Sequence, residues 1–455
     1  MANFGAPCEG LPFLAFKLSQ MMASFVGSLV VLAALVTAST TVTETVTVSE
    51  TTTVQPPPRF RFEPHPRATE GYGTCDLRTS ACALASLPRD RSTVVYPGGA
   101  TRCISTKKTE YGFQVIPGDA DKLVVYFQGG GACWDAASAA KAFCVEDAYP
   151  GYLSGVFDRR NAKNPYGKHT VVQLLYCSGD AFAADNATQA WTTVHGDVAV
   201  QTGQQNVEAT LAWIADQNLH LDDLVVAGDS AGSLATMAWA NAVLDAFPAK
   251  QRSLLFDSYA GIFPKGCQGT VLRDTWPTCT GPLASSLADL GLLDECRAGA
   301  LDIQAVLAAT ATRHADAPFA FIQSKADAVQ KGFFEAIALS FKIRPYLLSD
   351  AAFYERANDV FLGWNALPNV VHFSVDGDTH TFTEDRLLFS ADGTGPEGGG
   401  AGPSLVDWVR RLEDDGVATT ECTGTLEDER HWSGSSYCAR SLANKTFPPP
   451  PSSGN

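Results

Sequence analysis

The segment LVVAGDSAGSLATMAWANAVL, residues 224–244, changes from a strand pattern to a helix pattern within a few residues. Its apolar beginning is typical of a strand that is buried on both faces, and a helical pattern starts directly after Gly-Asp-Ser-Ala-Gly. Ser230 therefore stands between Gly228 and Gly232 in a G-x-S-x-G arrangement. A strand and a helix approach closely around such a sharp turn, so the residues two before and two after the serine must be small. The segment predicts either an ordinary turn or a serine nucleophile held at the tip of an elbow.

Short apolar runs alternate with helical patterns on both sides of this segment. The strand candidates are residues 122–128, 170–176, 223–228, 253–257, 318–323 and 370–375. The helix candidates are 204–217, 231–246 and, after a glycine-rich loop at 391–404, a last helix at 405–413. Nearly continuous Val, Leu, Ile and Phe is typical of parallel strands that helices cover. We therefore expect an α/β fold with a mostly parallel central sheet, helices on both faces and one large domain.

The two ends of the chain predict segments outside that domain. Residues 1–38 read as a signal peptide region, although translation starting at Met21 or Met22 and an uncleaved signal anchor are alternatives. Residues 39–70 are rich in Thr and Pro and predict a stalk or linker. The folded domain is expected at 71–446, and residues 447–455 predict a disordered Pro/Ser tail.

The composition limits the class of protein and its compartment. Among 455 residues, 45% are apolar and the net charge is −16, so the chain is globular and lacks the basic surface that nucleic acid requires. None of the twelve cysteines forms a CxxC pair, which favours disulfides over a zinc ribbon. Cys133/Cys144 and Cys422/Cys438 are the pairs that we expect from proximity. Together with two N-glycosylation sequons, these features indicate secretion.

A run of three glycines follows the strand candidate at 122–128. The sequence VVYFQGGGACWD (124–135) places Gly129, Gly130 and Gly131 directly after the apolar residues. Lipases and esterases use such a run to aim backbone N–H groups at a developing oxyanion, and the N–H of Ala231 at the elbow would face the same point. A phosphate-binding loop is the alternative, but neither GK[ST] nor GxGxxG is present.

A serine nucleophile needs a base and an acid, expected in the chain order Ser, Asp or Glu, His. His380 lies on a loop just past a strand candidate, which is where the base is expected. His372 lies within the strand pattern itself, and His314 lies in a polar segment that predicts a surface residue. For the acid, Asp257 and Asp327 each end or follow a strand after the elbow, and their positions alone leave both open.

Taken in order along the chain, these motifs resemble those of the pectin acetylesterase family, which includes the Notum-type carboxylesterases. The matching residues are Gly129, Gly130, Gly131 and Cys133; Tyr176, Cys177 and Asp180; Gly228, Ser230, Ala231 and Gly232; Asp257 and Ser258; Asp327 and Gln330; and His380 and Thr381. The resemblance runs from about residue 90 to 385. It implies an α/β-hydrolase-like fold.

The resemblance also implies roles for particular residues. It implies a catalytic triad of Ser230, Asp327 and His380, with Asp257 in a structural role. The implied oxyanion hole consists of the N–H groups of Gly130, Gly131 and Ala231. Plant-type members usually carry tryptophan where this chain has Ala132, with Trp134 nearby, so we expect this pair of residues to shape the acyl pocket. The last elbow glycine of the family is Ser233 here.

The expected function is that of a secreted serine carboxylesterase that hydrolyses O-acyl esters through an acyl-enzyme, without a cofactor or metal. The resemblance implies O-acetyl groups on an extracellular polysaccharide as the substrate, so the partner is an acylated carbohydrate or another ester. Removal of a longer acyl chain from a protein or lipid is the alternative, and a non-catalytic cell-surface binding protein is a third. We expect an extracellular or cell-wall location, with no stable membrane insertion unless the signal remains as an anchor.

Overall fold

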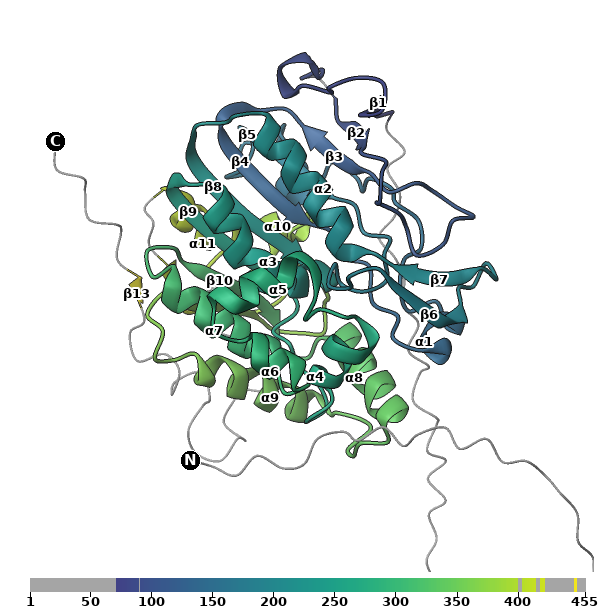
Figure 1. Cartoon of the computed structure of the whole chain (residues 1–455). Coiled ribbons are helices and arrows are strands. Elements are labelled where there is room, and N and C mark those ends of the chain that lie inside the picture. The colour runs from purple at the N-terminus through teal and green to yellow at the C-terminus, as the bar shows by residue number, and fades with distance from the viewer. Residues whose placement is uncertain (1–70, 90, 400–402, 415–417, 422–445, 448–455) are drawn as a thin grey trace, which may run out of the picture. The chain divides into compact units, whose positions relative to one another are not determined.

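The computed structural model describes residues 71–89, 91–399, 403–414, 418–421 and 446–447, all within one compact unit. Nine strands form its main sheet, in the order β1-β2-β3-β5-β4-β8-β9-β10-β11 (Figure 1). They are β1 (Gly73–Asp76), β2 (Thr93–Tyr96), β3 (Phe113–Ile116), β4 (Asp119–Phe127), β5 (His169–Leu174), β8 (Leu221–Asp229), β9 (Ala249–Asp257), β10 (Phe319–Ser324) and β11 (Val370–Val375). Two small ribbons pair β6 (Ala187–Thr192) with β7 (Val198–Gln201) and β12 (Ala418–Thr419) with β13 (Thr446–Phe447).

The six strands from β5 to β11 run parallel to one another, whereas β3 is antiparallel to β5 and to β2. The fold class predicted from the sequence is therefore confirmed. Those six strands are the six apolar runs of the sequence, with β5 ending two residues earlier than predicted. Parallel strands end at a common edge of the sheet, and the residues that follow β4, β8, β10 and β11 are thereby brought together.

Both faces of the sheet are buried because successive side chains of each strand point in opposite directions. On β8, Leu224 and Val226 belong to the larger core, while Val225 and Ala227 belong to the second core on the other face. The neighbouring β4 divides its residues in the same way. This alternation explains why the central strands are apolar without interruption.

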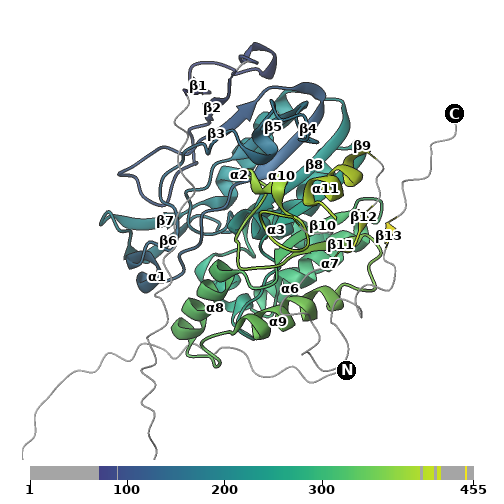
Figure 2. The same ribbon diagram turned by 180° about the vertical axis from the view of Figure 1, so that it is seen from behind.

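Helices cover the two faces unequally. The helices are α1 (Ala136–Ala140), α2 (Gly203–Asp216), α3 (Ala231–Ala246), α4 (Gln268–Thr270), α5 (Gly281–Asp289), α6 (Leu293–Arg297), α7 (Ile303–Arg313), α8 (Ala328–Phe341), α9 (Asp350–Gly363), α10 (Leu387–Ser390) and α11 (Leu405–Asp414). Figure 1 shows α2, α3, α5 and α7 in front of the sheet, and Figure 2 shows α10 and α11 on the opposite face. Trp408, Val409 and Leu412 of α11 close the second core.

The structure contradicts the prediction for His314 and agrees with the prediction for His372. His314 is buried, with 5% of its surface exposed, so its prediction as a surface residue is wrong. Its ring nitrogen Nε2 lies 3.1 Å from Asn241 Oδ1 on α3, because the end of α7 packs against that helix rather than facing solvent. His372 lies within β11, as predicted, and its ring stacks on that of Phe361 with centroids 4.1 Å apart.

Four disulfides occur among the described residues: Cys75–Cys82, Cys103–Cys177, Cys133–Cys144 and Cys279–Cys296. The predicted pair Cys133–Cys144 is one of them, and such bonds are typical of proteins that mature in an oxidising compartment. Within these same residues, no helix combines the length and the hydropathy needed to cross a membrane.

Several predictions fall outside the described residues. These are the signal region 1–38, the stalk 39–70, the pair Cys422/Cys438 and the tail from residue 448 onward. Phe447, where the predicted tail begins, lies in β13.

Candidate active site

Ser230 occupies a strained position between β8 and α3. Its φ of 52° and ψ of −121° lie where residues other than glycine are rarely found. The backbone is fixed there on both sides, since Ser230 N donates to Asp257 O at 2.8 Å and Ser233 N donates to Ser230 O at 3.0 Å. This conformation presents the Ser230 side chain at the edge of the sheet where the parallel strands end.

The two glycines of the elbow have no room for a side chain. A Cβ at Gly232 would lie 1.9 Å from the carbonyl oxygen of Phe127 on β4, and one at Gly228 would lie 2.3 Å from Gly232 O. Strand and helix thus pack in direct backbone contact around Ser230. This backbone contact is the reason why residues 228 and 232 must be small.

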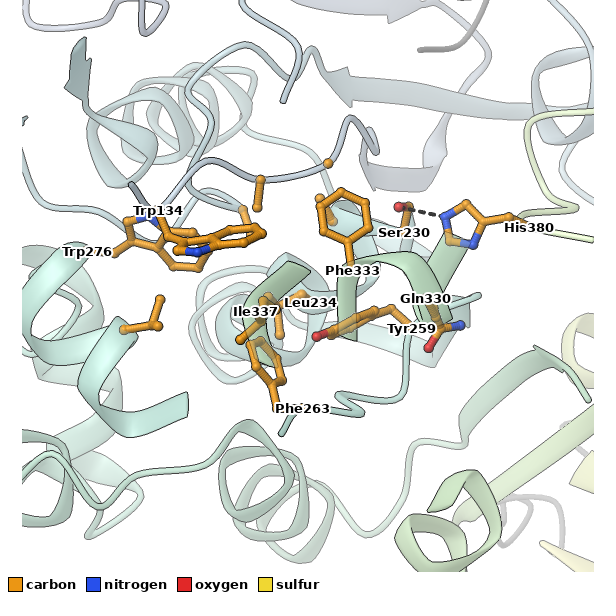
Figure 3. Close-up of a pocket in the computed structure, with 15 residues that line it drawn as sticks. Trp134, Ser230, Leu234, Tyr259, Phe263, Trp276, Gln330, Phe333, Ile337 and His380 are labelled. Carbon is orange, nitrogen blue, oxygen red and sulfur yellow. Dashed lines mark hydrogen bonds between the residues drawn. The ribbon is translucent and has the colours of Figure 1, made fainter. Parts of the chain in front are cut away.

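Ser230, His380 and Asp327 form one chain of hydrogen bonds. His380 Nε2 lies 2.8 Å from Ser230 Oγ, and His380 Nδ1 lies 2.8 Å from Asp327 Oδ2 (Figure 3). The serine follows β8, the aspartate follows β10 and the histidine follows β11. The structure therefore brings together the three side chains for which the family resemblance implies a triad.

Asp327 is held by the helix that it begins. It is the N-cap of α8, and its Oδ1 accepts a hydrogen bond from Gln330 N at 2.8 Å. The Gln330 side chain donates from Nε2 to Asp327 Oδ2 at 2.9 Å, beside the bond to His380. The carboxylate is fully buried, so its orientation toward His380 is fixed from both sides. Gln330, one of the residues that carry the family resemblance, thus holds the carboxylate through both its backbone and its side chain.

Asp257, the other acid candidate, contacts the chain after His380 rather than His380 itself. Its Oδ2 accepts hydrogen bonds from Phe382 N and from Thr383 N, each at 2.7 Å. Next to it, the hydroxyl of Ser258 accepts a hydrogen bond from Thr381 N at 2.9 Å. This buried pair clamps the loop that carries His380.

The surroundings of His380 favour its protonated form. Burial lowers the pKa of the imidazole, but the adjacent Asp327 carboxylate raises it through charge and hydrogen bonding. The buried carboxylates of Asp257 and Asp229 act in the same direction, and the net pKa lies above the ordinary value of 6.5.

The glycine run lies beside the elbow because β4 and β8 are neighbours in the sheet, with Phe127 opposite Gly228. Gly129 N donates to Asp229 Oδ1 at 2.9 Å, which ties the run to the elbow. Within the described part of the chain, the N–H groups of Gly130, Gly131 and Ala231 donate to no acceptor. Of these three residues, Gly131 and Ala231 line the apolar space next to Ser230.

The conformation of the run is fixed from outside. Gly131 has a φ of 71°, and a Cβ there would lie 2.0 Å from Phe143 O. The segment 143–145 pairs with the run through hydrogen bonds from Ala132 N to Phe143 O and from Val145 N to Gly130 O. The disulfide Cys133–Cys144 joins the same two segments covalently.

An apolar pocket opens beside Ser230, with an empty volume of about 550 Å³, open solvent included. Its lining residues are Gly131, Ala132, Trp134, Ala181, Ser230, Ala231, Leu234, Tyr259, Phe263, Val271, Trp276, Gln330, Phe333, Ile337 and His380. Figure 3 shows Trp134 and Trp276 together at the side away from Ser230, with Phe333 between them and the serine. The two residues expected to shape a pocket, Ala132 and Trp134, both line it.

Most of the pocket wall could not be named from the sequence. Tyr259 and Phe263 follow β9, Val271 begins a short π-helical turn whose C-cap is Trp276, and Phe333 lies on α8. Ser233, which replaces the last elbow glycine, donates through Oγ to Tyr259 O at 2.9 Å and thereby supports the wall.

One group among the described residues could hold a cation, and it is separate from this site. His169, Asp223 and Glu413 offer ligand atoms that all lie within 4.8 Å of one another. His169 begins β5 and Asp223 lies near the start of β8, at the opposite edge of the sheet from Ser230. His169 Nε2 and Asp223 Oδ2 are 2.8 Å apart.

A family model described as pectinacetylesterase matches residues 100–334, about half of the chain. The chain belongs to this family. The matched residues include the glycine run, the elbow at Ser230 and Asp327, whereas His380 lies outside the match. Membership makes the protein a carboxylic ester hydrolase.

No curated protein matches the sequence of this pectinacetylesterase family member. Among solved structures, the Wnt deacylase Notum from Drosophila is similar, at 15% sequence identity and a TM-score of 0.46. The match covers 67% of this chain and 88% of that one.

Proposed function

We propose that the protein is a serine esterase in which Ser230 attacks the ester carbonyl, His380 is the general base and Asp327 orients the imidazole. The observation that carries this proposal is the unbroken chain of 2.8 Å contacts from Ser230 Oγ through His380 to Asp327. A hydroxyl is a weak nucleophile until a neighbouring base takes its proton, and the base works only in the correct tautomer.

The reaction follows from that arrangement. His380 donates from Nδ1–H to Asp327, so Nε2 is free to take the proton of Ser230 Oγ as this oxygen bonds to the carbonyl carbon. The resulting oxyanion would accept hydrogen bonds from the N–H groups of Gly130, Gly131 and Ala231. His380 then returns the proton to the leaving alcohol, which leaves an acyl-Ser230 ester. Water, deprotonated by His380, releases the acid and restores Ser230.

The pocket supports an acyl group longer than acetyl. Its wall beside Ser230 is built from tryptophan, phenylalanine, leucine, isoleucine and valine side chains, and an acetyl methyl would touch only the part nearest the serine. Each methylene buried in such a wall contributes about 0.8 kcal/mol. We therefore infer that the substrate is an ester of a medium or long acyl chain, carried by a protein, a lipid or a carbohydrate.

An O-acetyl ester on an extracellular polysaccharide is the second candidate, and the pectinacetylesterase match supports it. In that case the pocket would bind part of the polymer or remain largely unused. In both cases we propose that the protein acts outside the cell or in the cell wall, which the four disulfides support.

A series of nitrophenyl esters tests the proposal and separates the two candidates. We expect kcat/KM to rise from acetyl through butyryl to octanoyl, by roughly 10²-fold between the last two if all four added methylenes are buried. Ser230→Ala is the control that attributes the activity to this site. A maximum at acetyl, together with acetate release from acetylated pectin, would favour the second candidate instead.

The raised pKa of His380 predicts the acid limb of the pH profile. The general base must be neutral, so kcat/KM is full above this pKa and falls as pH drops through it. Because the pKa of His380 lies above 6.5, the pH at which kcat/KM falls to half of its maximum should also lie above 6.5. The measurement is kcat/KM for the butyryl ester from pH 5 to 9 at constant ionic strength. A half-point below 6.5 would contradict the assignment of His380 or the influence of Asp327.

A further inference from the structure

A second apolar cavity adjoins the pocket beside Ser230. Its empty volume is about 380 Å³, open solvent included. Alanine, leucine, isoleucine and valine side chains and Thr278 line it, among them Ala181, Leu234, Ala238 and Leu272. Ala181 and Leu234 line both spaces, so these two residues form part of the boundary between them.

The lining of the second cavity is suited to hydrocarbon and to little else. Among the residues that line the second cavity, Thr278 is the one polar residue. Its hydroxyl already donates to Trp276 O at 2.6 Å. Water in a cavity needs two or more polar partners, so an apolar cavity stays dry or takes an apolar ligand. A space of this kind beside an acyl pocket therefore suggests a use.

The divider between the two spaces has two parts. Leu234 lies on α3, one turn after Ser230, and is 7% exposed. The other part is the stretch 271–278, in which Val271 and Trp276 line the first pocket while Leu272 and Thr278 line the second cavity. A turn of π-helix occupies residues 271–275 of that stretch, and such turns recur at functional sites.

We propose that the second cavity is a distal acyl subsite, which receives the end of a chain too long for the first pocket when the Leu234 side chain moves aside. This inference rests on the proposed function, because the chain must be held as an ester at Ser230. On this proposal, Leu234 and the volume around Ala238 set the length of the longest acyl chain that the enzyme accepts.

The test compares dodecanoyl and butyryl nitrophenyl esters, each below its micelle concentration. Ala238→Leu adds bulk to the second cavity without touching the first pocket. We expect it to lower the ratio of dodecanoyl to butyryl kcat/KM by at least about tenfold, since each methylene excluded from an apolar site costs about fourfold. Leu234→Ala removes the divider and should raise the same ratio severalfold.

Ala242→Leu is the matched control. It makes the same change one turn further along α3, where the residue lines neither space, and should leave the ratio as in the wild type. If Ala238→Leu changes the ratio no more than Ala242→Leu, the chain does not enter the second cavity and the inference is wrong. An unchanged or lower ratio in Leu234→Ala would reject Leu234 as the divider. Loss of the proposed function itself would be seen separately, as butyryl hydrolysis that does not depend on Ser230.

Discussion

Replacing Ser230 by alanine is expected to lower kcat for nitrophenyl butyrate by at least about 10³-fold while the protein stays folded. The substitution removes one oxygen atom and keeps the Cβ that the elbow already accommodates. Without that oxygen no acyl-enzyme forms, and only the N–H groups around the carbonyl remain to assist attack by water. The measurement is steady-state kcat of purified wild type and variant, with thermal unfolding as the check of the fold.

Ser285→Ala is the control for this prediction, because Ser285 is an exposed serine on α5. It should retain wild-type kcat. Equal activity of the Ser230→Ala variant and the wild type would reject the serine mechanism and would favour a binding protein or a different nucleophile.

Asp327→Asn is expected to lower kcat by roughly 10³- to 10⁴-fold. Asparagine can still cap α8, so the helix start should be retained. The amide that replaces Oδ2, however, would donate toward His380 Nδ1, which would then have to become the acceptor. The ring proton would move to Nε2, the atom that must take the proton of Ser230.

The matched control is Asp378→Asn, an exposed residue two positions before His380. It should change kcat by less than about twofold, since substitutions away from the reacting groups have small effects. If Asp327→Asn retains most of the activity, then Asp327 is not the orienting acid and the role would pass to another carboxylate, with Asp257 the nearest rival in the sequence.

The six parallel strands from β5 to β11 could be predicted because they are buried on both faces of the sheet. Runs such as 223–228 and 370–375 are nearly continuous in apolar residues, which is typical of parallel strands covered on both faces. β1, β2 and β3 were missed because each has only four residues and lies toward one edge of the sheet, where the pattern is brief. The helices from α5 to α9 were not predicted, although α7 buries residues at helical spacing, among them Ile303, Val306, Leu307 and Thr310.

The hydrogen-bonded chain at Ser230 could be anticipated because chemistry restricts which residue types serve and because strand order restricts where they stand. The clamp by Asp257 and Ser258 could not be read from the sequence, since its partners are backbone N–H groups more than 120 residues away. The pocket wall was equally hidden, because its side chains come from separate loops and helices that meet only in the fold.

Covalent labelling of the nucleophile tests the central claim most directly. The full-length protein would be treated with an octyl fluorophosphonate, and the adduct would be located by intact mass and peptide mass spectrometry. We predict one adduct per chain, on Ser230, with loss of esterase activity in proportion to labelling and no adduct in Ser230→Ala. Labelling at another residue, or full inactivation with Ser230 unmodified, would contradict the account.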